Sequence, residues 1–192
     1  MKEITVQKRL LRNELREQRK QINKQQLLQD SAVLCERLLA LPELQNANTV
    51  FCYVSDGGEV ETHRLIQKLL SDGRQVAVPR CGKNGEMDAV VISSISDLQP
   101  GMKEILEPSS DMPAISVDQI DFAVVPAVAC GRDGSRLGQG GGYYDRFLEQ
   151  ASCSFAAVCL EEYLLPALPC ENHDRFMKII VTQQRVLRFE EV

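Results

Sequence analysis

The chain has 192 residues, of which 44% are hydrophobic and 26% are charged. These values are ordinary for one soluble globular domain and exclude a wholly disordered, collagen-like or coiled-coil chain. The net charge of −5 argues against a protein that binds nucleic acid over its whole surface. The charge is uneven, because residues 1–24 carry eight basic and three acidic side chains. A basic N-terminal segment on an acidic body indicates an anionic ligand.

The seven cysteines are expected to be reduced and structural. Their odd number, their wide spacing and the lack of a C-x-x-C pair fit neither a disulfide framework nor a zinc site. A nucleophilic Cys130, directly before a glycine-rich segment, is the alternative. The chain has no run of ~18 apolar residues and no signal-peptide pattern. We therefore expect a cytoplasmic protein without a membrane partner.

The predicted elements begin with helix over residues from about 5 to 41, where apolar residues recur at helical spacing. A break near Asn23 divides this segment into two helices, and Pro42 is expected to end it. Strands are expected at residues 49–54, 75–78, 87–92, 121–125, 155–160, 178–182 and 185–189, and further helices at 62–71 and about 142–150. Thr62 is expected to cap the helix that follows it, and Pro79 and Pro126 to stop the strands before them. Residues 96–118, with three prolines, predict an irregular excursion or lid.

Strands that alternate with helices predict an α/β fold, a three-layer α/β/α sandwich with a mostly parallel central sheet. We expect a single domain over residues 1–192, with N-terminal helices at about 5–41 and an α/β core at about 49–190. In such sheets the ligand crevice lies at the carboxyl ends of the strands.

The most informative segment is the glycine-rich stretch of residues 131–145, GRDGSRLGQGGGYYD, between a predicted strand and a predicted helix. Its six glycines allow the backbone to approach a ligand closely. Amides near a helix N-terminus form an anion site, and Arg136 can bind a phosphate. The segment is neither a Walker A loop nor a dinucleotide fingerprint, because no Gly-Lys-Ser/Thr follows and Tyr143 stands where the third glycine would fall. A long flexible turn is the alternative.

The N-terminal helix offers a second candidate. Lys8, Arg12 and Arg16 stand at i, i+4 and i+8, so their three cations share one stripe. A solvated basic face is the alternative. A role in binding phosphate requires that this stripe reach the glycine-rich segment.

Acidic residues supply the remaining candidates. Glu59 and Glu61 follow the first strand, where a carboxylate can face a ligand, although helix-start acids favoured by the macrodipole are the alternative. The cluster of residues 171–174 contains two further acids. Carboxylates near nucleotide phosphates are typical Mg²⁺ partners, and Asp145 and Asp174 are the pair that we expect to hold the metal. His63 and His173, the two histidines, receive no catalytic role.

Six short segments occur in an order that spans nearly the whole chain. They are Lys8-Arg9-x-x-Arg12; Ser55 through Glu59-Val60-Glu61-Thr62; Val78-Pro79-Arg80; Val125-Pro126-x-Val128-Ala129; Asp133-Gly134-x-Arg136-Leu137-Gly138-x-Gly140-x-Gly142-Tyr143-Tyr144-Asp145; and Pro169 to Asp174 leading into Ile179-Ile180-Val181-Thr182. The glycine-rich segment ending in Tyr-Tyr-Asp is the specific element. In these segments the chain resembles the 5-formyltetrahydrofolate cyclo-ligase family, also called methenyltetrahydrofolate synthetase.

The resemblance implies an enzyme that closes 5-formyltetrahydrofolate to 5,10-methenyltetrahydrofolate with ATP and Mg²⁺ and releases ADP and phosphate. It implies that the formyl oxygen takes the γ-phosphoryl group, and that N10 of the folate then attacks the activated carbon of this imidate phosphate. Such chemistry requires positioning and neutralisation of phosphate charge. The partners implied are ATP and 5-formyltetrahydrofolate, with no nucleic acid, and a monomer is expected.

The resemblance also implies roles for individual residues. The implied catalytic residues are Arg136, Lys8 and Tyr144. The implied ATP-binding residues are Lys8, Arg9, Arg12, Gly134, Arg136, Leu137, Gly138, Gln139, Gly140, Gly141, Gly142, Tyr143 and Tyr144. The implied folate-binding residues are Val54, Glu59, Gln139, Gly140, Gly141, Gly142 and Tyr143, and Asp145 and Asp174 match metal positions.

One departure from the family pattern concerns charge. Many relatives read Gly-Arg-Gly-Lys-Gly in the loop, whereas Gln139 and Gly141 replace the two basic residues here. We expect Arg136 to carry more of the charge and Gly141 to offer a backbone amide. The remaining basic residues of the N-terminal segment, among them Arg16, Arg19, Lys20 and Lys24, are expected to be solvated.

Two other functions remain as alternatives. A sugar-phosphate isomerase or an acyl-CoA-transferase-like enzyme would share the sheet architecture, but it needs a carboxylate–lysine or glutamyl-nucleophile constellation that the sequence does not assemble. A regulatory protein that binds ATP or folate without turnover is favoured only by the altered loop.

Overall fold

An eight-stranded sheet forms the centre of the computed structural model, which describes residues 2–82, 85–101, 105–171 and 174–190. Its strands, in spatial order, are β13 (Val186–Arg188), β12 (Ile179–Val181), β10 (Ser154–Val158), β7 (Phe122–Pro126), β1 (Thr49–Cys52), β2 (Gln75–Cys81), β3 (Met87–Ile92) and β6 (Ala114–Ile115). The neighbours from β12 to β2 pair in parallel, and β13, β3 and β6 pair antiparallel at the two sides. The expectation of a mostly parallel sheet is confirmed.

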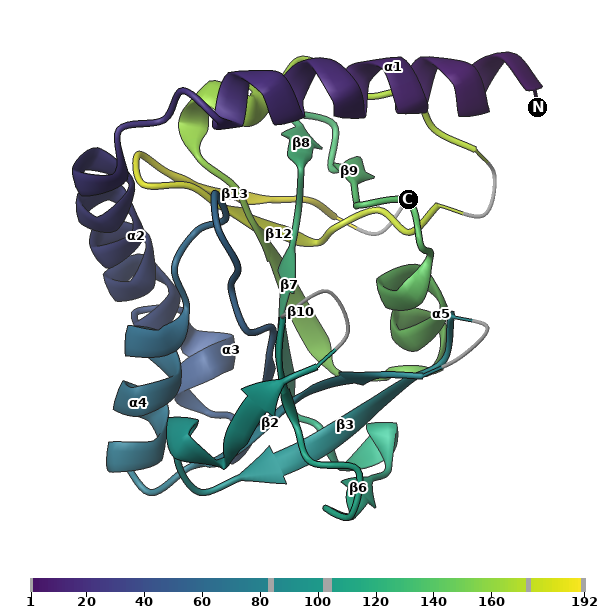
Figure 1. Cartoon of the computed structure of the whole chain (residues 1–192). Coiled ribbons are helices and arrows are strands. Elements are labelled where there is room, and N and C mark those ends of the chain that lie inside the picture. The colour runs from purple at the N-terminus through teal and green to yellow at the C-terminus, as the bar shows by residue number, and fades with distance from the viewer. Residues whose placement is uncertain (1, 83–84, 102–104, 172–173, 191–192) are drawn as a thin grey trace.

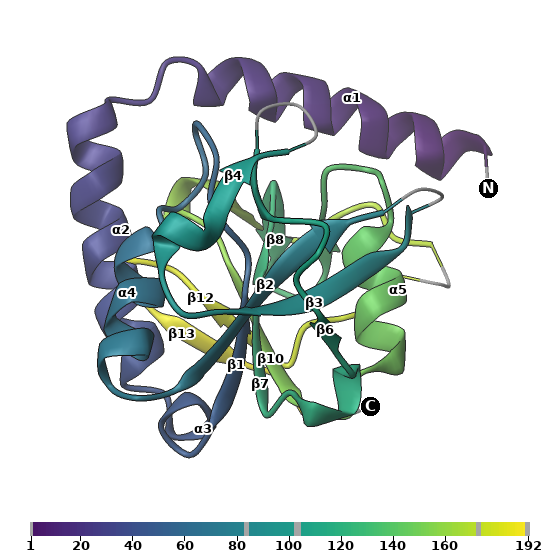
Figure 2. The same ribbon diagram turned by 60° about the horizontal axis from the view of Figure 1, so that its bottom comes forward.

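Helices cover both faces of this sheet (Figure 1). On one face lie α2 (Lys24–Leu39), the single turn α3 (Pro42–Gln45) and α4 (His63–Ser71), and on the other lies α5 (Tyr143–Gln150). The N-terminal helix α1 (Lys2–Arg19) lies across one end of the sheet, as the turned view of Figure 2 also shows. The three-layer α/β/α prediction is therefore confirmed. Within the described ranges, no helix combines the length and the apolar character needed to cross a membrane.

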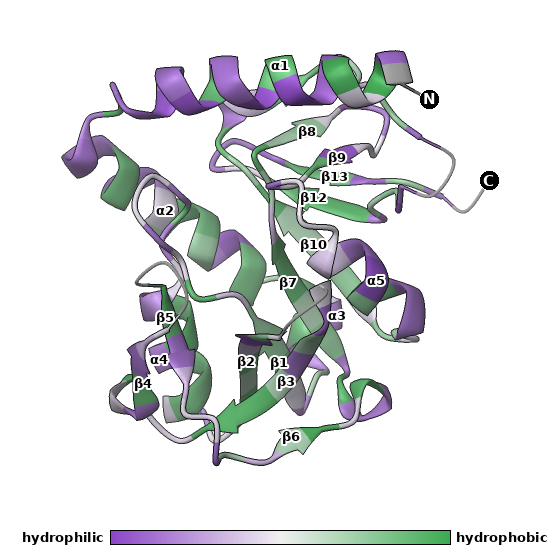
Figure 3. Cartoon of the chain, turned by 45° about the vertical axis from the view of Figure 1, so that its right-hand side comes forward, coloured by the Kyte–Doolittle hydropathy of each residue, from purple (hydrophilic) through white to green (hydrophobic). Residues whose placement is uncertain are grey.

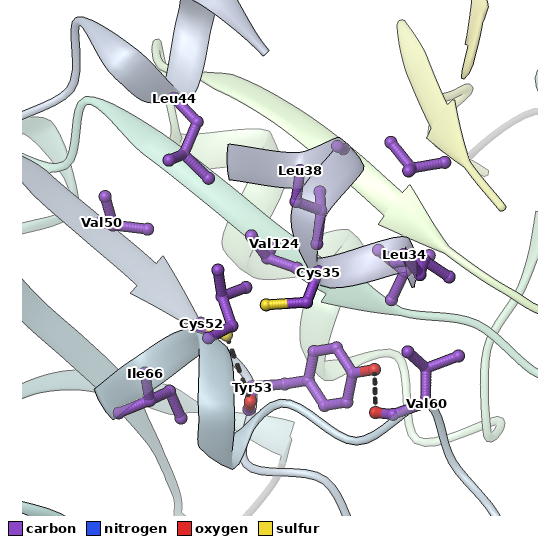
Figure 4. Packing of buried hydrophobic residues seen from close by; sticks show 14 of the residues in the cluster. Leu34, Cys35, Leu38, Leu44, Val50, Cys52, Tyr53, Val60, Ile66 and Val124 are labelled. Atoms are coloured by element: carbon purple, nitrogen blue, oxygen red, sulfur yellow. Dashed lines mark hydrogen bonds between the residues drawn. The ribbon is translucent and has the colours of Figure 1, made fainter. Parts of the chain in front are cut away.

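The core has two halves because successive strand side chains point to opposite faces. Val50 and Cys52 face α2 to α4, whereas Phe51 between them faces α5, where its ring stacks on Phe147 at a centroid distance of 4.4 Å. Figure 4 shows Leu34 and Leu38 of α2 in the same cluster of buried side chains as Val50 and Val124 on the first face. Figure 3 shows the apolar central strands in green and a largely hydrophilic α1. The continuous apolar runs of the parallel strands thus fill both halves.

The helix boundaries near residues 23 and 42 are set by different residues. Asn23 is the N-cap of α2, since its side chain accepts hydrogen bonds from the amides of Gln25 at 2.9 Å and Gln26 at 3.2 Å. The predicted break between two helices is confirmed. The helical segment ends shortly before Pro42, where α2 stops at Leu39, and Pro42 begins the separate single turn α3. Its missing N–H costs nothing there, since the first amides of a helix have no partner within it.

Pro79 lies within β2, so the expectation that it stops the strand is wrong, whereas β7 does end at Pro126. Pairing of β1 ends at Ala77 on β2 and at Val124 on β7. Beyond these points each strand pairs on one side only, Pro79 with Ala89 and Pro126 with Val158. A strand with one neighbour tolerates a residue that has no N–H to donate.

The sequence analysis missed several short elements. The described part of residues 96–118 contains β4 (Leu98–Pro100) and β5 (Leu106–Pro108), which form their own two-stranded sheet. A three-stranded sheet of order β11-β8-β9 contains β8 (Ala129–Gly131), β9 (Arg136–Leu137) and β11 (Leu164–Leu165). The first half of the glycine-rich segment therefore belongs to the hairpin of β8 and β9 and has a regular structure.

Thr62 precedes α4 as expected, but its side chain does not cap the helix. Its hydroxyl donates to the carbonyl of Tyr53 at 2.7 Å and accepts from the amide of Ser55 at 3.0 Å. The hydroxyl of Ser55 accepts from the amide of Thr62 at 3.0 Å. These bonds close the loop of residues 53–62 onto itself, and this loop carries Glu59.

Replacing Thr62 with valine is expected to lower the free energy of unfolding by about 1–3 kcal/mol, the cost of leaving buried polar groups unpaired. Thr62 is buried and valine has the same shape, so hydrogen bonding is the main change. Urea unfolding of the variant measures the effect, with Thr62→Ser, which keeps the hydroxyl, as the control. A serine variant as unstable as the valine variant would contradict this explanation.

Candidate active site

A cavity of about 830 Å³ opens at the carboxyl ends of β1 and β7, where the fold class predicted the ligand crevice. It brings together segments that are far apart in the sequence. Its lining includes Lys8, Arg12, Arg16 and Arg19 of α1 and Lys20 directly after it; Tyr53, Val54 and residues 56–59 after β1; residues 126–128 at and after the end of β7; residues 136–145; and Glu171 and Asp174. Its volume is within the usual range for a small-molecule site.

The glycine loop, residues 138–142, leads into α5 along one side of this cavity. Gly140 has a φ of +98° and Gly142, the N-cap of α5, a φ of +67°. A β-carbon at Gly140 would lie 3.4 Å from the guanidinium carbon of Arg12. Arg12 also donates through Nε to the carbonyl of Gly138 at 2.7 Å. The basic stripe of α1 therefore does reach the glycine loop, which was the condition for a phosphate-binding role.

Arg136 lies on β9 with only 8% of its surface exposed. Its Nη2 atom donates to Oδ1 of Asp145 at 2.7 Å, and Nη1 donates to the carbonyl of Pro126 at 3.1 Å. The guanidinium carbon is 5.9 Å from the ring centroid of Tyr144, within range of a cation–π contact. The ion pair with Asp145 and the short β8–β9 hairpin thus fix a buried positive charge at the cavity wall.

Lys8 lies between two carboxylates that also line the cavity. Its Nζ is 3.0 Å from Oε2 of Glu171 and 2.5 Å from Oδ2 of Asp174. Desolvation alone would lower the pKa of Lys8, but the hydrogen bonds and charges of these carboxylates outweigh it and raise that pKa. Lys8 is therefore a permanent cation at neutral pH. The other two members of the predicted 171–174 cluster, Asn172 and His173, lie outside the described residues.

Arg16 and Arg19 were expected to be solvated, which is wrong for the partly buried Arg19; Arg16 is exposed as expected, but it also contacts the glycine loop. Arg16 donates through Nη2 to the side-chain oxygen of Gln139 at 2.9 Å. Arg19 donates to the carbonyls of Ala127 at 2.9 Å and Val128 at 2.7 Å. Arg16 was already a member of the predicted stripe, and Arg19 continues that stripe two turns beyond Arg12, so the spacing of basic residues was the signal that could have added Arg19. Lys20 and Lys24 are exposed, as expected.

Of the two candidate acids after β1, only Glu59 lines the cavity. Its Oε1 accepts from the side chain of Gln139 at 3.5 Å, and its Oε2 accepts from the amide of Asp56 at 3.2 Å. Partial burial raises the pKa of the Glu59 carboxyl. Glu61 instead accepts from the amide of Arg64 in the first turn of α4, as the helix-start alternative predicted.

Tyr144 forms part of the wall next to Arg136. Desolvation, with the charge of Glu59 as a second cause, raises the pKa of Tyr144 well above its ordinary value. Its hydroxyl is therefore protonated at neutral pH and can donate to a ligand oxygen. Tyr53 is similar, with its pKa raised by desolvation and its hydroxyl donating to the carbonyl of Val60 at 2.8 Å.

The residues that the resemblance implied lie together in this cavity, with two exceptions. Arg9 lines only an adjoining cavity of about 340 Å³, which shares Arg12, Arg16 and the loop residues Gln139 and Gly140 with the large one. Gly134, with a φ of +89°, packs against the carbonyl of Met177 and the ring of Phe189. Its position shapes the turn between β8 and β9 and does not face the cavity.

The alternative of a nucleophilic Cys130 is not supported. A hydrogen bond with Cys159, followed by desolvation, raises the pKa of the Cys130 thiol well above its ordinary value. A fully buried thiol with a raised pKa is unreactive. All seven cysteines are free thiols, as expected.

Asp145 and Asp174, the expected metal residues, both line the cavity. Desolvation and the charge of Arg16 lower the pKa of Arg12, and the negative charges of the two aspartates oppose this shift. Each accepts a hydrogen bond from a cation, Asp145 from Arg136 and Asp174 from Lys8. Over the described ranges no three His, Cys, Asp or Glu residues cluster as a potential metal cage. Two carboxylates without a cage suit Mg²⁺, which binds through one or two carboxylates together with substrate phosphates and water.

An α/β fold with a charged cavity at the carboxyl ends of its parallel strands defines a class of small-ligand enzymes. Residues 4–183 match the 5-formyltetrahydrofolate cyclo-ligase family. The chain belongs to this family, and it is an enzyme. The expected resemblance is confirmed.

Individual relatives match over most of the chain. The 5-formyltetrahydrofolate cyclo-ligase of Mus musculus is 27% identical over 194 residues, covering 91% of this chain and 93% of the relative. That of Mycolicibacterium smegmatis is 32% identical over 148 residues, covering 73% of this chain and 76% of the relative. The solved structure of 5,10-methenyltetrahydrofolate synthetase from Aquifex aeolicus is 27% identical with a TM-score of 0.86, covering 96% of this chain and 94% of that one.

Proposed function

We propose that the protein converts 5-formyltetrahydrofolate into 5,10-methenyltetrahydrofolate with consumption of ATP and release of ADP and phosphate. One observation carries the proposal: Lys8 and Arg12 of α1, Arg136 of β9 and the glycine loop all line one cavity. Positive side chains and backbone amides that converge in this way suit a nucleotide triphosphate. The names of the relatives supply the substrate and the product.

The proposed reaction has two steps. The formyl oxygen attacks the γ-phosphorus of ATP, and the bond to ADP breaks. Atom N10 of the folate then attacks the activated formyl carbon and loses its proton, and phosphate leaves as the five-membered ring closes. Neither step needs a nucleophile from the protein, so the protein contributes positioning, charge stabilisation and exclusion of water.

Arg136, Lys8 and Tyr144 are proposed to contact the transferring phosphoryl group. Arg136 is held by Asp145 at 2.7 Å, so its charge is preorganised and needs no rearrangement when negative charge develops. Lys8 and Arg12 are proposed to bind the phosphates from the side of α1, and amides of the glycine loop from the other side. The Tyr144 hydroxyl, protonated because its pKa is raised, can donate to a phosphoryl or formyl oxygen.

Asp145 and Asp174 are the residues proposed to hold Mg²⁺ next to the phosphates. A bound Mg²⁺ would neutralise phosphate charge and help to orient the phosphate chain. Both carboxylates also hold cations of the site, Arg136 and Lys8. Each therefore positions a phosphate-binding side chain whether or not the metal is present.

The folate is proposed to lie against Val54, Glu59 and residues 139–143. Val54 is almost fully buried at the end of β1 and offers apolar contact. The Glu59 carboxylate, which already accepts from Gln139, can accept hydrogen bonds from N–H groups of the substrate. Its raised pKa indicates that a hydrogen-bond donor would stabilise its charged form.

Purified protein with Mg·ATP and 5-formyltetrahydrofolate is expected to develop the absorbance of the methenyl product, with one phosphate released per product formed. The same reaction with EDTA in excess over Mg²⁺ is expected to form none, and added Mg²⁺ to restore it. Absence of both product and phosphate at saturating substrates would contradict the proposed activity. Product formation unaffected by EDTA would contradict the metal requirement alone.

A further inference from the structure

The glycine loop has no charged side chain of its own, since residues 138–142 read Gly-Gln-Gly-Gly-Gly. Its cations come from the flanking helices instead. Arg12 and Arg16 of α1 donate to Gly138 and Gln139, and Arg146 of α5 donates to the carbonyl of Gly141 at 2.6 Å. Among these three, only Arg12 and Arg16 line the large cavity.

Arg16, like Arg12 and Arg19, differs from Lys8 and Arg136 in that its hydrogen-bond partners are neutral oxygens and not carboxylates. Lys8 is paired with two carboxylates and Arg136 with one. Arg16 makes no ion pair within the part of the chain that the structure describes, and its partners are the backbone and side-chain oxygens of Gln139 at 3.3 and 2.9 Å. The amide of Gln139 is neutral, so it orients the guanidinium without cancelling the charge.

Arg16 is also placed where a ligand can reach it. It lines both the 830 Å³ cavity and the adjoining 340 Å³ cavity, and so do Gln139 and Gly140. Its guanidinium is solvent-exposed, so an approaching anion does not have to displace a buried partner. An exposed but oriented positive charge can form a charge-assisted contact with a phosphate.

We propose that Arg16 binds the phosphate chain of the nucleotide and provides uncompensated positive charge to the glycine loop, with Gln139 orienting its guanidinium. The inference rests on the proposed function, because it assumes that ATP occupies the cavity. It adds Arg16 to the proposed nucleotide-binding residues. It also explains how a loop without charged side chains has positive charge beside it, since that charge comes from α1. Since this charge is exposed, its contribution depends on the charge of the ligand and falls with ionic strength.

Three variants test the role of this charge by calorimetric titration with ATP, ADP and AMP at constant Mg²⁺, without folate. Arg16→Gln is expected to weaken ATP binding about 5- to 20-fold, the scale of a charge-assisted contact reduced by solvent screening. The loss is expected to be smaller for ADP and smallest for AMP. Arg16→Lys, which keeps the charge, is expected to bind ATP nearly as the wild type does. Lys24→Gln removes one exposed charge from the start of α2, outside both cavities, and is expected to change nothing.

The role of position is tested by moving the charge. The double variant Arg16→Gln and Gln139→Arg exchanges the two side chains across their 2.9 Å contact and is expected to regain most of the lost ATP affinity. Thermal unfolding of each variant identifies any that is not folded.

An equal loss for ATP, ADP and AMP after Arg16→Gln, or no loss at all, would contradict phosphate binding by Arg16. Its role would then be only to connect α1 to the loop. Failure of Arg16→Lys to bind ATP would do the same. A wild-type protein that binds ATP but forms no methenyl product would refute the proposed reaction and leave this inference standing. A wild-type protein that binds no nucleotide would overturn both.

Discussion

Replacing Arg136 with alanine is expected to lower kcat/KM for ATP by at least ~100-fold, the scale observed when a group that stabilises transition-state charge is removed. Arg136 is 8% exposed, and its guanidinium donates to Asp145 at 2.7 Å. Because the position is buried, water cannot easily stabilise the phosphoryl charge in place of the missing guanidinium. The loss is expected mainly in kcat, since the negative charge on the phosphoryl oxygens is greatest during transfer. Steady-state kinetics with ATP varied at saturating folate measure both parameters.

Two controls separate this role from a loss of structure. Arg136→Lys keeps a charge but loses one of the two directed contacts, to Asp145 or to Pro126, and is expected to fall between the wild type and alanine. Arg175→Ala removes an exposed arginine that donates to the carbonyl of Leu148 outside the cavity, and is expected to have normal kinetics. Unchanged kinetics in a folded Arg136→Ala protein would remove Arg136 from the catalytic residues.

Replacing Lys8 with methionine is expected to raise KM for ATP by roughly 30- to 100-fold and to leave KM for the folate nearly unchanged, on the scale of a lost buried charge-assisted contact. Lys8 is 6% exposed and faces Glu171 and Asp174. Methionine keeps much of the length but leaves both carboxylates without this cation, so repulsion of the phosphates adds to the lost attraction. The melting temperature is expected to fall as well.

The structural and functional parts of this effect can be separated. Adding Asp174→Asn to Lys8→Met removes one unpaired carboxylate and is expected to recover part of the melting temperature without recovering ATP affinity. Because the pKa of Lys8 is raised above its ordinary value of 10.5, the stabilisation from its charge is complete below that value. It is lost only as the pH rises through the folded-state pKa. A change in wild-type stability near neutral pH therefore has another source, and recovery of ATP affinity in the double variant would contradict a direct role of Lys8.

Features with a local cause were predictable from the sequence. Asn23 separates α1 from α2 because its side chain accepts from the amides of Gln25 and Gln26, two and three residues further along the chain, an interaction that needs no distant partner. The parallel strands were recognisable because burial on both faces requires continuous apolar runs. The glycine-rich segment stood out because few backbone functions need so many glycines, and Gly140 and Gly142 do adopt positive φ.

Elements that depend on a distant partner were missed. The strands β8 and β9 are three and two residues long, too short for a periodic pattern, and each exists because the other pairs with it. Pro79 remains within β2 because pairing with the neighbouring strand β1 ends at Ala77, two residues before it, a property of the sheet and not of proline. Thr62 was misassigned because its hydroxyl finds Tyr53, nine residues earlier.

The sequence alone determined the family, the α/β class and the types of residue in the site, because each follows from local patterns of hydrophobicity, glycine and charge. The tertiary structure decided which cations act on the loop. Lys8 pairs with carboxylates more than 160 residues away, and Arg16 and Arg19 meet carbonyls more than 100 residues away. Helical spacing places these side chains on one stripe, but only the position of α1 across the sheet directs that stripe at the cavity. Charge neutralised by a neighbour and charge available to a ligand look alike in a sequence, and they differ only in what the fold places beside them.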